Sequence, residues 1–271
     1  MARQVIYLTT AGAGTWNVPA DWNNTDNTVE CIGGGGAGGY GAGSFYGGGG
    51  GAYSLKNNLS LTAGGTADYS VGAGGIGSRA NDVNAGGDTW FKSTSDVLAK
   101  GGQGGNTNTG YGGDAAAGVG DTKYSGGRGG NRSGYSYGGG GGGAAGKNSN
   151  GGAGQNATSA CNPPASARAG IGGVGGTGGG GVGGMFDCLT YYADFAGGAG
   201  TEWDATHGSG GGGSGSYNGS VTNGSGGKYG GGSGQVQNDS QGHRGGYQGV
   251  IRISYEPAAL LKSLATLGVG K

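Results

Sequence analysis

The chain has 271 residues, of which 81 are glycine and 4 are proline, and it carries 15 basic and 15 acidic residues. Average proteins contain roughly 7% glycine, and collagen would require glycine at every third position together with abundant proline, so this sequence is glycine-rich but not collagenous. The formal net charge of zero argues against long-range attraction to nucleic acid or to an anionic membrane.

Glycine-rich chains are often disordered, because glycine loses the most backbone entropy on folding. This sequence nevertheless contains 15 Tyr, 4 Trp and 4 Phe, and only 11% of its residues are charged. Disordered segments are typically charged and short of aromatic residues. We therefore expect an ordered chain, whose glycine content has a structural cause.

Short strands are predicted near both ends of the chain, where β-branched and aromatic residues lie between turn residues. The strongest of them is the last, and we expect it to return beside the first strands and close the domain. Short strands of this kind indicate a small β-sandwich. The predicted strands are residues 5–10, 14–19, 28–32, 52–55, 59–61, 67–71, 89–92 and 247–255.

Between residues 101 and 246 glycine runs replace the strand pattern. A glycine run buries no side chain, and each of its hidden amides and carbonyls must find a partner. Threefold left-handed extended helices, the polyglycine II form, satisfy both demands, because their main-chain groups point outward in three directions toward neighbouring helices. The sequence therefore predicts a packed slab of polyglycine II helices.

Position in such a slab determines composition. A segment inside it must be almost entirely glycine, as in residues 138–143, whereas a segment on the rim can show a side chain at every third residue, as Val174 and Thr177 do. The predicted fold is all-β with irregular structure: a sandwich from residues 1–100 and 247–256, a polyglycine II slab from 101–246, and a helix or tail from 257–271.

Catalytic and metal-binding motifs are not evident. The two histidines, His207 and His243, have no nucleophile or metal-ligand spacing, and glycine motifs of the nucleotide-binding type arise here from composition alone. Residues 141–148 approach a phosphate-binding loop, but Asn148 occupies the position where Ser or Thr would hold magnesium. We expect no catalysis, no metal and no cofactor.

The insertions between glycine runs are the expected binding residues, because they lie at turns of the slab. Tyr and Trp provide rigid contact area at low entropic cost, with glycine and serine as adaptable neighbours. A small satellite core made by Phe186, Tyr191, Tyr192 and Phe195 is an equal alternative. The predicted receptor-binding residues are Tyr135, Tyr137, Phe186, Asp187, Tyr191, Tyr192, Asp194, Phe195, Trp203 and Asp204.

The end of the chain predicts a short helix, with Pro257 at its first position and Gly268 at its end. Leu260, Leu261, Leu264 and Leu267 form one apolar stripe on it. So short a helix needs a partner surface, either on its own domain or, as we favour, on a neighbouring subunit.

The N-terminal segment lacks the apolar stretch of a signal peptide, so synthesis and folding in a cytoplasm are expected. The three cysteines are too few for a disulfide framework. Cys161 and Cys188 could pair after release into oxidising surroundings, but buried free thiols are the favoured interpretation.

Two motifs resemble the glycine-rich domain of phage tail and tail-fibre proteins. Residues 7–19 read Tyr-Leu-Thr-Thr-Ala-Gly-Ala-Gly-Thr-Trp-Asn-Val-Pro, and residues 29–36 read Val-Glu-Cys-Ile-Gly-Gly-Gly-Gly. The resemblance ends with residues 250–253. The later glycine runs resemble the polyglycine sandwich of T-even-like tail-fibre tip adhesins, although the N-terminal part differs from the fibre-attachment domain of those proteins.

The resemblance implies a virion adhesin, made in the host cytoplasm, that binds a bacterial outer-membrane protein or surface polysaccharide without enzymatic activity. Other tail or fibre subunits are the implied partners, together with self-association, for example as a trimer. The alternative is a structural virion component, such as a fibre, decoration or baseplate subunit, that binds no receptor.

Overall fold

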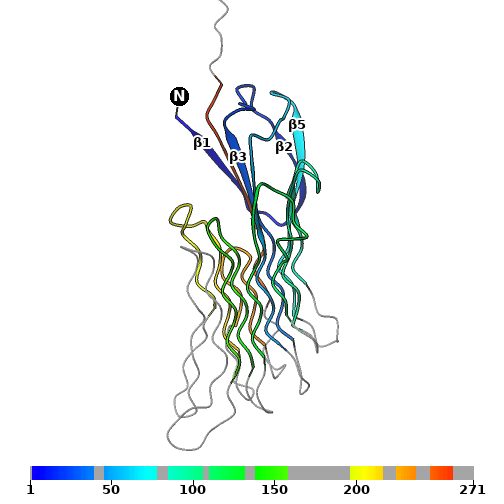
Figure 1. Cartoon of the computed structure of the whole chain (residues 1–271), viewed down its shortest axis with the longest axis vertical. Helices are drawn as coiled ribbons and strands as arrows, with labels where there is room; N and C mark the ends of the chain where they lie inside the picture. The colour runs from blue at the N-terminus through cyan, green and yellow to red at the C-terminus, as the bar shows by residue number, and fades with distance from the viewer. Residues whose placement is uncertain are drawn as a thin grey trace, which may run out of the picture.

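The computed structural model describes residues 2–39, 46–77, 85–105, 110–131, 138–157, 196–215, 224–235 and 245–258. Over these ranges the chain is all-β, with two antiparallel sheets and no helix. The sheets form a sandwich at one end of an elongated molecule, and extended glycine segments continue from it side by side (Figure 1). The predicted all-β class is confirmed.

The larger sheet has five strands in the order β1-β9-β3-β4-β8. The last strand, β9, lies between β1 and β3 and is antiparallel to both, so that Ile253 faces Ile6 on one side and Val29 on the other. The predicted return of the last strand is therefore confirmed. The strands are β1 (Gln4–Leu8), β3 (Asn27–Ile32), β4 (Tyr53–Asn57), β8 (Thr122–Tyr124) and β9 (Val250–Tyr255).

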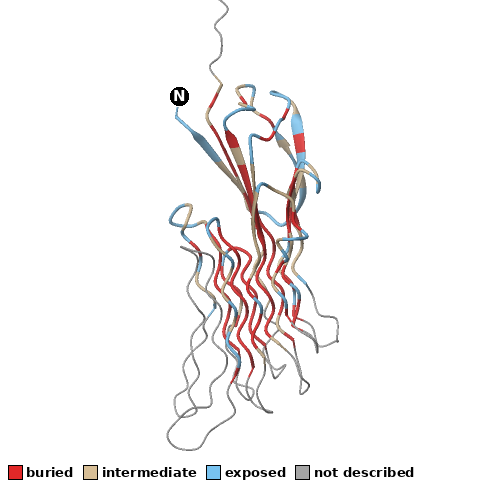
Figure 2. Cartoon of the chain, viewed as in Figure 1, coloured by how far each residue is buried: buried red, intermediate tan, exposed pale blue. Residues whose placement is uncertain are grey.

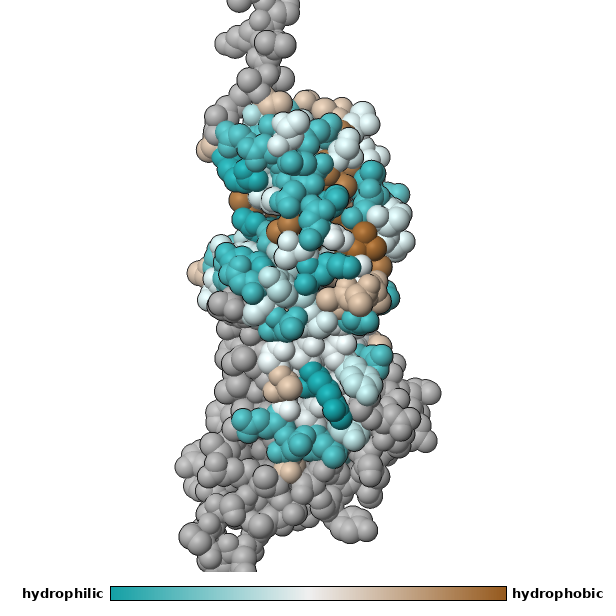
Figure 3. Space-filling view, viewed as in Figure 1, coloured by the Kyte–Doolittle hydropathy of each residue, from teal (hydrophilic) through white to brown (hydrophobic). Residues whose placement is uncertain are grey.

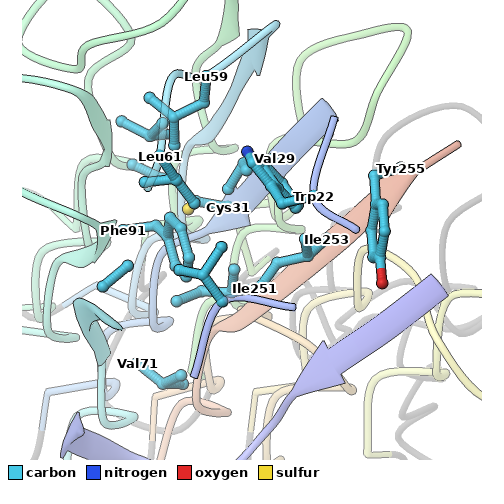
Figure 4. Packing of buried hydrophobic residues seen from close by; sticks show 14 residues of the cluster. Trp22, Val29, Cys31, Leu59, Leu61, Val71, Phe91, Ile251, Ile253 and Tyr255 are labelled. Carbon is cyan, nitrogen blue, oxygen red and sulfur yellow. The ribbon is translucent and has the colours of Figure 1, made fainter. Parts of the chain in front are cut away.

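The smaller sheet has the order β2-β5-β6-β7 and covers the first sheet with an apolar face. Val29, Cys31 and Ile251 contribute to the core from one sheet, and Val71 and Phe91 from the other (Figure 4). The β-branched and aromatic residues that predicted the strands thus form the interior. The strands are β2 (Gly12–Asn17), β5 (Thr66–Val71), β6 (Thr89–Phe91) and β7 (Val97–Ala99).

Three short elements differ from the sequence prediction. The strand predicted at residues 59–61 is wrong, because the amides of Leu59 and Leu61 donate to the side chains of Asn27 and Asn24, each at 2.8 Å, instead of pairing with a strand. Strands β7 and β8 were not predicted, since each has only three residues and an alternating pattern needs more.

The glycine segments outside the sheets pack together into what we call the glycine array. Strand β3 continues directly into it at Gly33, and β4 emerges from it at Tyr53. Segments from before and after residue 100 interleave, so the predicted division at that residue does not separate the two parts. The array comprises residues 33–39, 46–52, 72–77, 85–88, 100–105, 110–113, 125–131, 138–145, 151–157, 196–200, 208–215, 224–235 and 245–249.

Hydrogen bonds in the glycine array rotate with a period of three residues. Successive amides of residues 46–52 donate to three different neighbouring segments, and the fourth amide returns to the first neighbour. The bonds, each 2.8–2.9 Å long, run from the amides of Gly47, Gly48, Gly49, Gly50, Gly51 and Ala52 to the carbonyls of Gly130, Ser233, Gln103, Gly127, Gly230 and Lys100, respectively.

Residues 138–145 follow the same rotation. The carbonyls of residues 46–52 accept hydrogen bonds from segments other than those to which its amides donate, among them residues 33–39 and 138–145. Neighbours therefore surround a central segment on all sides, which buries residues 47–52 and 138–145 (Figure 2). The predicted interior position of residues 138–143 is confirmed, whereas Val174 and Thr177 lie outside the described residues.

Close approach of the main chains explains why the interior is glycine. A Cβ atom on Gly48, Gly50 or Gly51 would overlap the backbone carbonyl of Gly36, Gly143 or Gly33, respectively. These contacts are with backbone, which cannot move aside as the end of a flexible side chain can. Any side chain at these positions would separate two hydrogen-bonded segments.

Of the predicted C-terminal helix, the structure describes only Pro257 and Ala258, which are not helical. Leu260, Leu261, Leu264 and Leu267 lie outside the described residues, so the predicted helix and subunit interface stay predictions.

Gly50→Ala should destabilise the protein strongly, because the added methyl group would overlap the Gly143 carbonyl. We expect a loss of about 3 kcal/mol or more in the free energy of unfolding, measured by urea denaturation. Gly65→Ala is the matched control, since its Cβ would lie 3.0 Å from the nearest atom, the Thr62 carbonyl oxygen, and it should cost much less. Equal losses would contradict the packing described for the glycine array.

Candidate functional site

The direction of the chain through the glycine array alternates. Residues 33–39, 72–77, 100–105, 125–131, 151–157, 208–215 and 230–235 run away from the sandwich. Each is followed, after a stretch outside the described residues, by a segment that runs back toward it (Figure 1). The seven stretches outside the described residues that separate these outgoing and returning segments are residues 40–45, 78–84, 106–109, 132–137, 158–195, 216–223 and 236–244.

Hydrogen bonds between segment ends fix this arrangement. The amide of Gly39 donates to the carbonyl of Tyr46 at 3.0 Å, and Tyr46 forms a bridge with Asn131. The amide of Ala157 donates to the carbonyl of Asn131 at 2.9 Å. The ends of four separate segments are therefore neighbours, and we call this side of the array its distal end.

The described ends of the chain lie on the opposite side, at the sandwich. Arg3 donates to the Asp26 carboxylate at 2.8 Å, and the amide of Glu256 donates to the Asp26 carbonyl at 3.0 Å. The amide of Ala258 donates to the carbonyl of Asp21 at 2.8 Å. The two ends of the long axis therefore differ: the described chain ends lie at the sandwich, and the distal end of the array lies opposite them.

The predicted receptor-binding residues divide into two groups. Tyr135, Tyr137, Phe186, Asp187, Tyr191, Tyr192, Asp194 and Phe195 lie outside the described residues. Trp203 and Asp204 are described, and they lie in a turn at residues 201–207 that connects two segments on the sandwich side. The structure therefore does not bring these two residues to the distal end.

Trp203 lies over the outer face of the larger sheet. Its indole Nε1–H donates to Glu30 Oε1 at 3.0 Å, and its ring centroid is 6.2 Å from that of Tyr7. The residue is half-buried, and its polar atom already has an internal partner. Its clearest role in the structure is to attach the 201–207 turn to the sheet.

Glu30 is the centre of this attachment. Its side chain is only 4% exposed, it forms an ion pair with Arg252 on the adjacent strand, and it accepts a hydrogen bond of 2.7 Å from the Tyr53 hydroxyl. Burial and the neighbouring Glu30 carboxylate raise the pKa of Tyr53 well above its ordinary value. Although burial disfavours its charge, Glu30 raises the pKa of Arg252. Near neutral pH, Tyr53 therefore stays protonated and neutral, and Arg252 stays positively charged.

Asp204 organises the turn itself. Its carboxylate accepts hydrogen bonds from the amides of Thr206 and His207, at 2.8 and 3.0 Å, and lies 2.8 Å from His207 Nδ1. Desolvation acts to raise the pKa of Asp204, but these hydrogen bonds and one from Tyr7 hold it well below its usual range. The His207 ring stacks on Tyr7, with centroids 3.8 Å apart.

Sequence reasoning missed Tyr7, Glu30 and Arg252 as parts of this cluster. A signal was present, because Glu30 and Arg252 are opposite charges, each flanked on both sides by apolar residues of its strand. Such residues are rarely buried unless they are paired. Knowing that β3 and β9 are adjacent would have been required to pair them.

The described part of the chain holds no group of three or more His, Cys, Asp or Glu side chains arranged for a metal ion. It also holds no helix that is long and apolar enough to span a membrane. Cys31 is a buried free thiol whose pKa is raised by burial, and Cys161 and Cys188 lie outside the described residues.

Arg252→Met should cost about 3–5 kcal/mol in the free energy of unfolding, because it leaves Glu30 charged and buried without its partner. Lys56→Met is the control, since the Lys56–Asp121 pair is more exposed and should contribute less than about 1 kcal/mol. Adding Glu30→Gln to Arg252→Met should recover part of the loss. Equal losses of unfolding free energy in Arg252→Met and Lys56→Met would show that Glu30 can stay buried without its ion-pair partner.

Asp204→Asn should change the pH dependence of stability. Because the folded state lowers the pKa of Asp204, its carboxylate stabilises the protein above the ordinary Asp value of about 3.9, and this contribution disappears as the pH falls through the lower, folded value. Urea unfolding of both proteins should therefore show a difference that is constant above about pH 5 and shrinks toward pH 2. A difference in the free energy of unfolding that stays the same down to pH 2 would contradict this role of Asp204.

Comparison of the sequence with protein-family models and with curated protein sequences returns no match. The motifs at residues 7–19 and 29–36 therefore carry the resemblance to phage tail proteins without the support of a family assignment. What the chain does has to be inferred from its own residues and their geometry.

Proposed function

We propose that the chain is a non-enzymatic phage virion adhesin, a tail-fibre or tail-tip protein whose glycine array holds receptor-binding loops. The observation that carries this proposal is the alternation of the chain, which brings the described ends of successive segments, among them Gly39, Tyr46 and Asn131, together at the distal end. Loops held by a rigid framework are a common location for binding residues.

We further propose that the segments of the array are polyglycine II helices. The rotation of amide donors among three neighbours with a period of three residues supports this form, because polyglycine II has three residues per turn and no internal hydrogen bonds. The same form accommodates parallel and antiparallel neighbours, and both occur: residues 46–52 run antiparallel to residues 33–39, and residues 151–157 run parallel to residues 125–131.

The sequences of the stretches outside the described residues suit recognition of a surface. They contain Tyr135 and Tyr137, the aromatic and acidic residues between 186 and 195, and many Ser, Thr and Asn residues. Aromatic side chains with small polar neighbours are typical of binding loops. A bacterial outer-membrane protein or surface polysaccharide is the proposed receptor, and the virion, after assembly in the host cytoplasm, is the proposed location.

The alternative function is a structural virion component that binds no receptor. The apolar stripe of Leu260, Leu261, Leu264 and Leu267 favours it, because the stripe follows β9 at the sandwich side and would suit attachment to another tail subunit or to copies of this chain, for example in a trimer. Attachment through this side and recognition through the distal end are compatible, so the stripe does not decide between the two functions.

Competition with phage adsorption tests the proposal. The purified full-length protein should reduce the adsorption rate of a phage that carries it, and Tyr191→Ala with Tyr192→Ala should weaken this effect at least tenfold without lowering the melting temperature. Gln4→Ala with Val5→Ala, two exposed residues of β1 on the sandwich side, is the matched control and should leave competition unchanged. Loss of virion assembly on deletion of the protein, together with no competition, would favour the structural alternative.

A further inference from the structure

One rim of the glycine array is formed by two parallel segments with side chains at every third residue. The amides of Gly151, Gly154 and Ala157 donate to the carbonyls of Ser125, Arg128 and Asn131, at 3.0, 2.8 and 2.9 Å. The non-glycine positions Ser125, Arg128 and Asn131 thus lie beside Asn150, Ala153 and Asn156. On the face seen in Figure 3, a pale band of near-neutral residues crosses the array, and hydrophilic side chains gather on the side of this band away from the sandwich.

Asparagine side chains of one segment bind the amides of the other. The amide of Ser125 donates to Asn150 Oδ1 at 2.9 Å, and the amide of Asn131 donates to Asn156 Oδ1 at 2.7 Å. By the same three-residue step, the amide of Arg128 should donate to residue 153. That residue is alanine and has no acceptor, and the amide of Arg128 has no hydrogen-bond partner among the residues that the structure describes.

A groove of about 620 Å³ opens where this acceptor is missing. We call it the Arg128 groove, and its lining residues are Arg128, Gly129, Asn131, Ala153, Gly154, Gln155 and Asn156. The side chains of Ala153, Gln155 and Asn156 are exposed, so a ligand could reach it from solvent.

The Arg128 guanidinium lies over two aromatic rings. It is 5.3 Å from the ring centroid of Tyr46 and 5.6 Å from that of Tyr111. These cation–π contacts restrict the side chain, and no carboxylate of the described ranges forms an ion pair with it. A fixed cation without an acidic partner and a free backbone amide therefore lie at one groove.

We propose that the Arg128 groove binds an acidic saccharide through the carboxylate on its sugar ring. One carboxylate oxygen accepts from the Arg128 amide, in the place that an asparagine Oδ1 would occupy, and the guanidinium pairs with the carboxylate. Arginine suits this role because its planar fork matches a carboxylate. Gln155 and Asn156, which line the groove, supply amide groups for hydroxyls.

A carboxylate fits the groove better than its alternatives. Arg128 is the one cationic residue among those lining it, which matches one negative charge rather than the nearly two of a phosphate monoester. A neutral sugar would leave the guanidinium without a partner. The inference rests on the proposed function, since it assigns a ligand class to an adhesin that binds host surface polysaccharide.

Amide NMR of the ¹⁵N-labelled full-length protein tests the inference. The probe is a tetrasaccharide of alternating glucuronic acid and N-acetylglucosamine, with an N-acetylglucosamine tetrasaccharide and glucose 6-phosphate as comparisons. The acidic tetrasaccharide should shift the Arg128 amide resonance in a saturable manner, and it should bind at least tenfold more tightly than either comparison.

Variants at two positions sharpen the test. Ala153→Asn should complete the row of asparagines, shift the Arg128 amide without ligand and weaken binding at least tenfold, while the melting temperature stays the same or rises. Ala153→Gly is the matched control and should retain binding, because it leaves the amide free and the groove open. Arg128→Gln should weaken binding at least tenfold.

Three results would overturn the inference: no saturable shift of the Arg128 amide, equal or tighter binding of the neutral or phosphorylated sugar, or binding that survives both Ala153→Asn and Arg128→Gln. Phage adsorption separates this failure from failure of the proposed function. If the wild-type protein binds no sugar, and both it and Ala153→Asn still compete with phage adsorption, the Arg128 groove alone is overturned. If the wild-type protein binds the acidic sugar but does not compete with adsorption, the adhesin role is overturned.

Discussion

Lateral hydrogen bonds between glycine backbones are the interaction on which the rest of the molecule depends. In residues 46–52 each amide donates outward and none closes a bond within its own segment. A single bond of this kind contributes only about 0.5–1.5 kcal/mol, so a segment is stable only when neighbours surround it. The need for close approach then excludes side chains, which explains both the 81 glycines and the low share of charged residues.

The sandwich gives the glycine array its starting register. Strand β3 enters the array without a turn, and β4 leaves it in the same way, so the pairing of these strands aligns the first two segments. The segments that flank residues 201–207 have no strand of their own. Their turn is instead attached to the outer face of the sheet through Trp203 and Glu30. Strand pairing and a buried polar contact therefore both fix the position of array segments relative to the sandwich.

The sequence predicted the all-β class, most of the strands and the return of β9, because burial between two sheets leaves a recognisable pattern in residues such as Val29 and Ile253. It failed at residues 59–61, where two asparagine side chains replace a strand partner, and at β7 and β8, which are too short to show a pattern. The Glu30–Arg252 pair and the free Arg128 amide depend on which segments are neighbours. A glycine run carries no side-chain pattern that depends on its neighbours, so the sequence alone could not predict which segments lie side by side.

The period of three has a consequence for how such a chain can change in evolution. Removing one residue from residues 125–131 would turn the remainder of the segment by a third of a revolution, aim the Arg128 or Asn131 side chain at a neighbouring backbone and disrupt its bonds. Removing three would shorten the segment and keep every orientation. Insertions and deletions within segments should therefore be tolerated in triplets of amino acids.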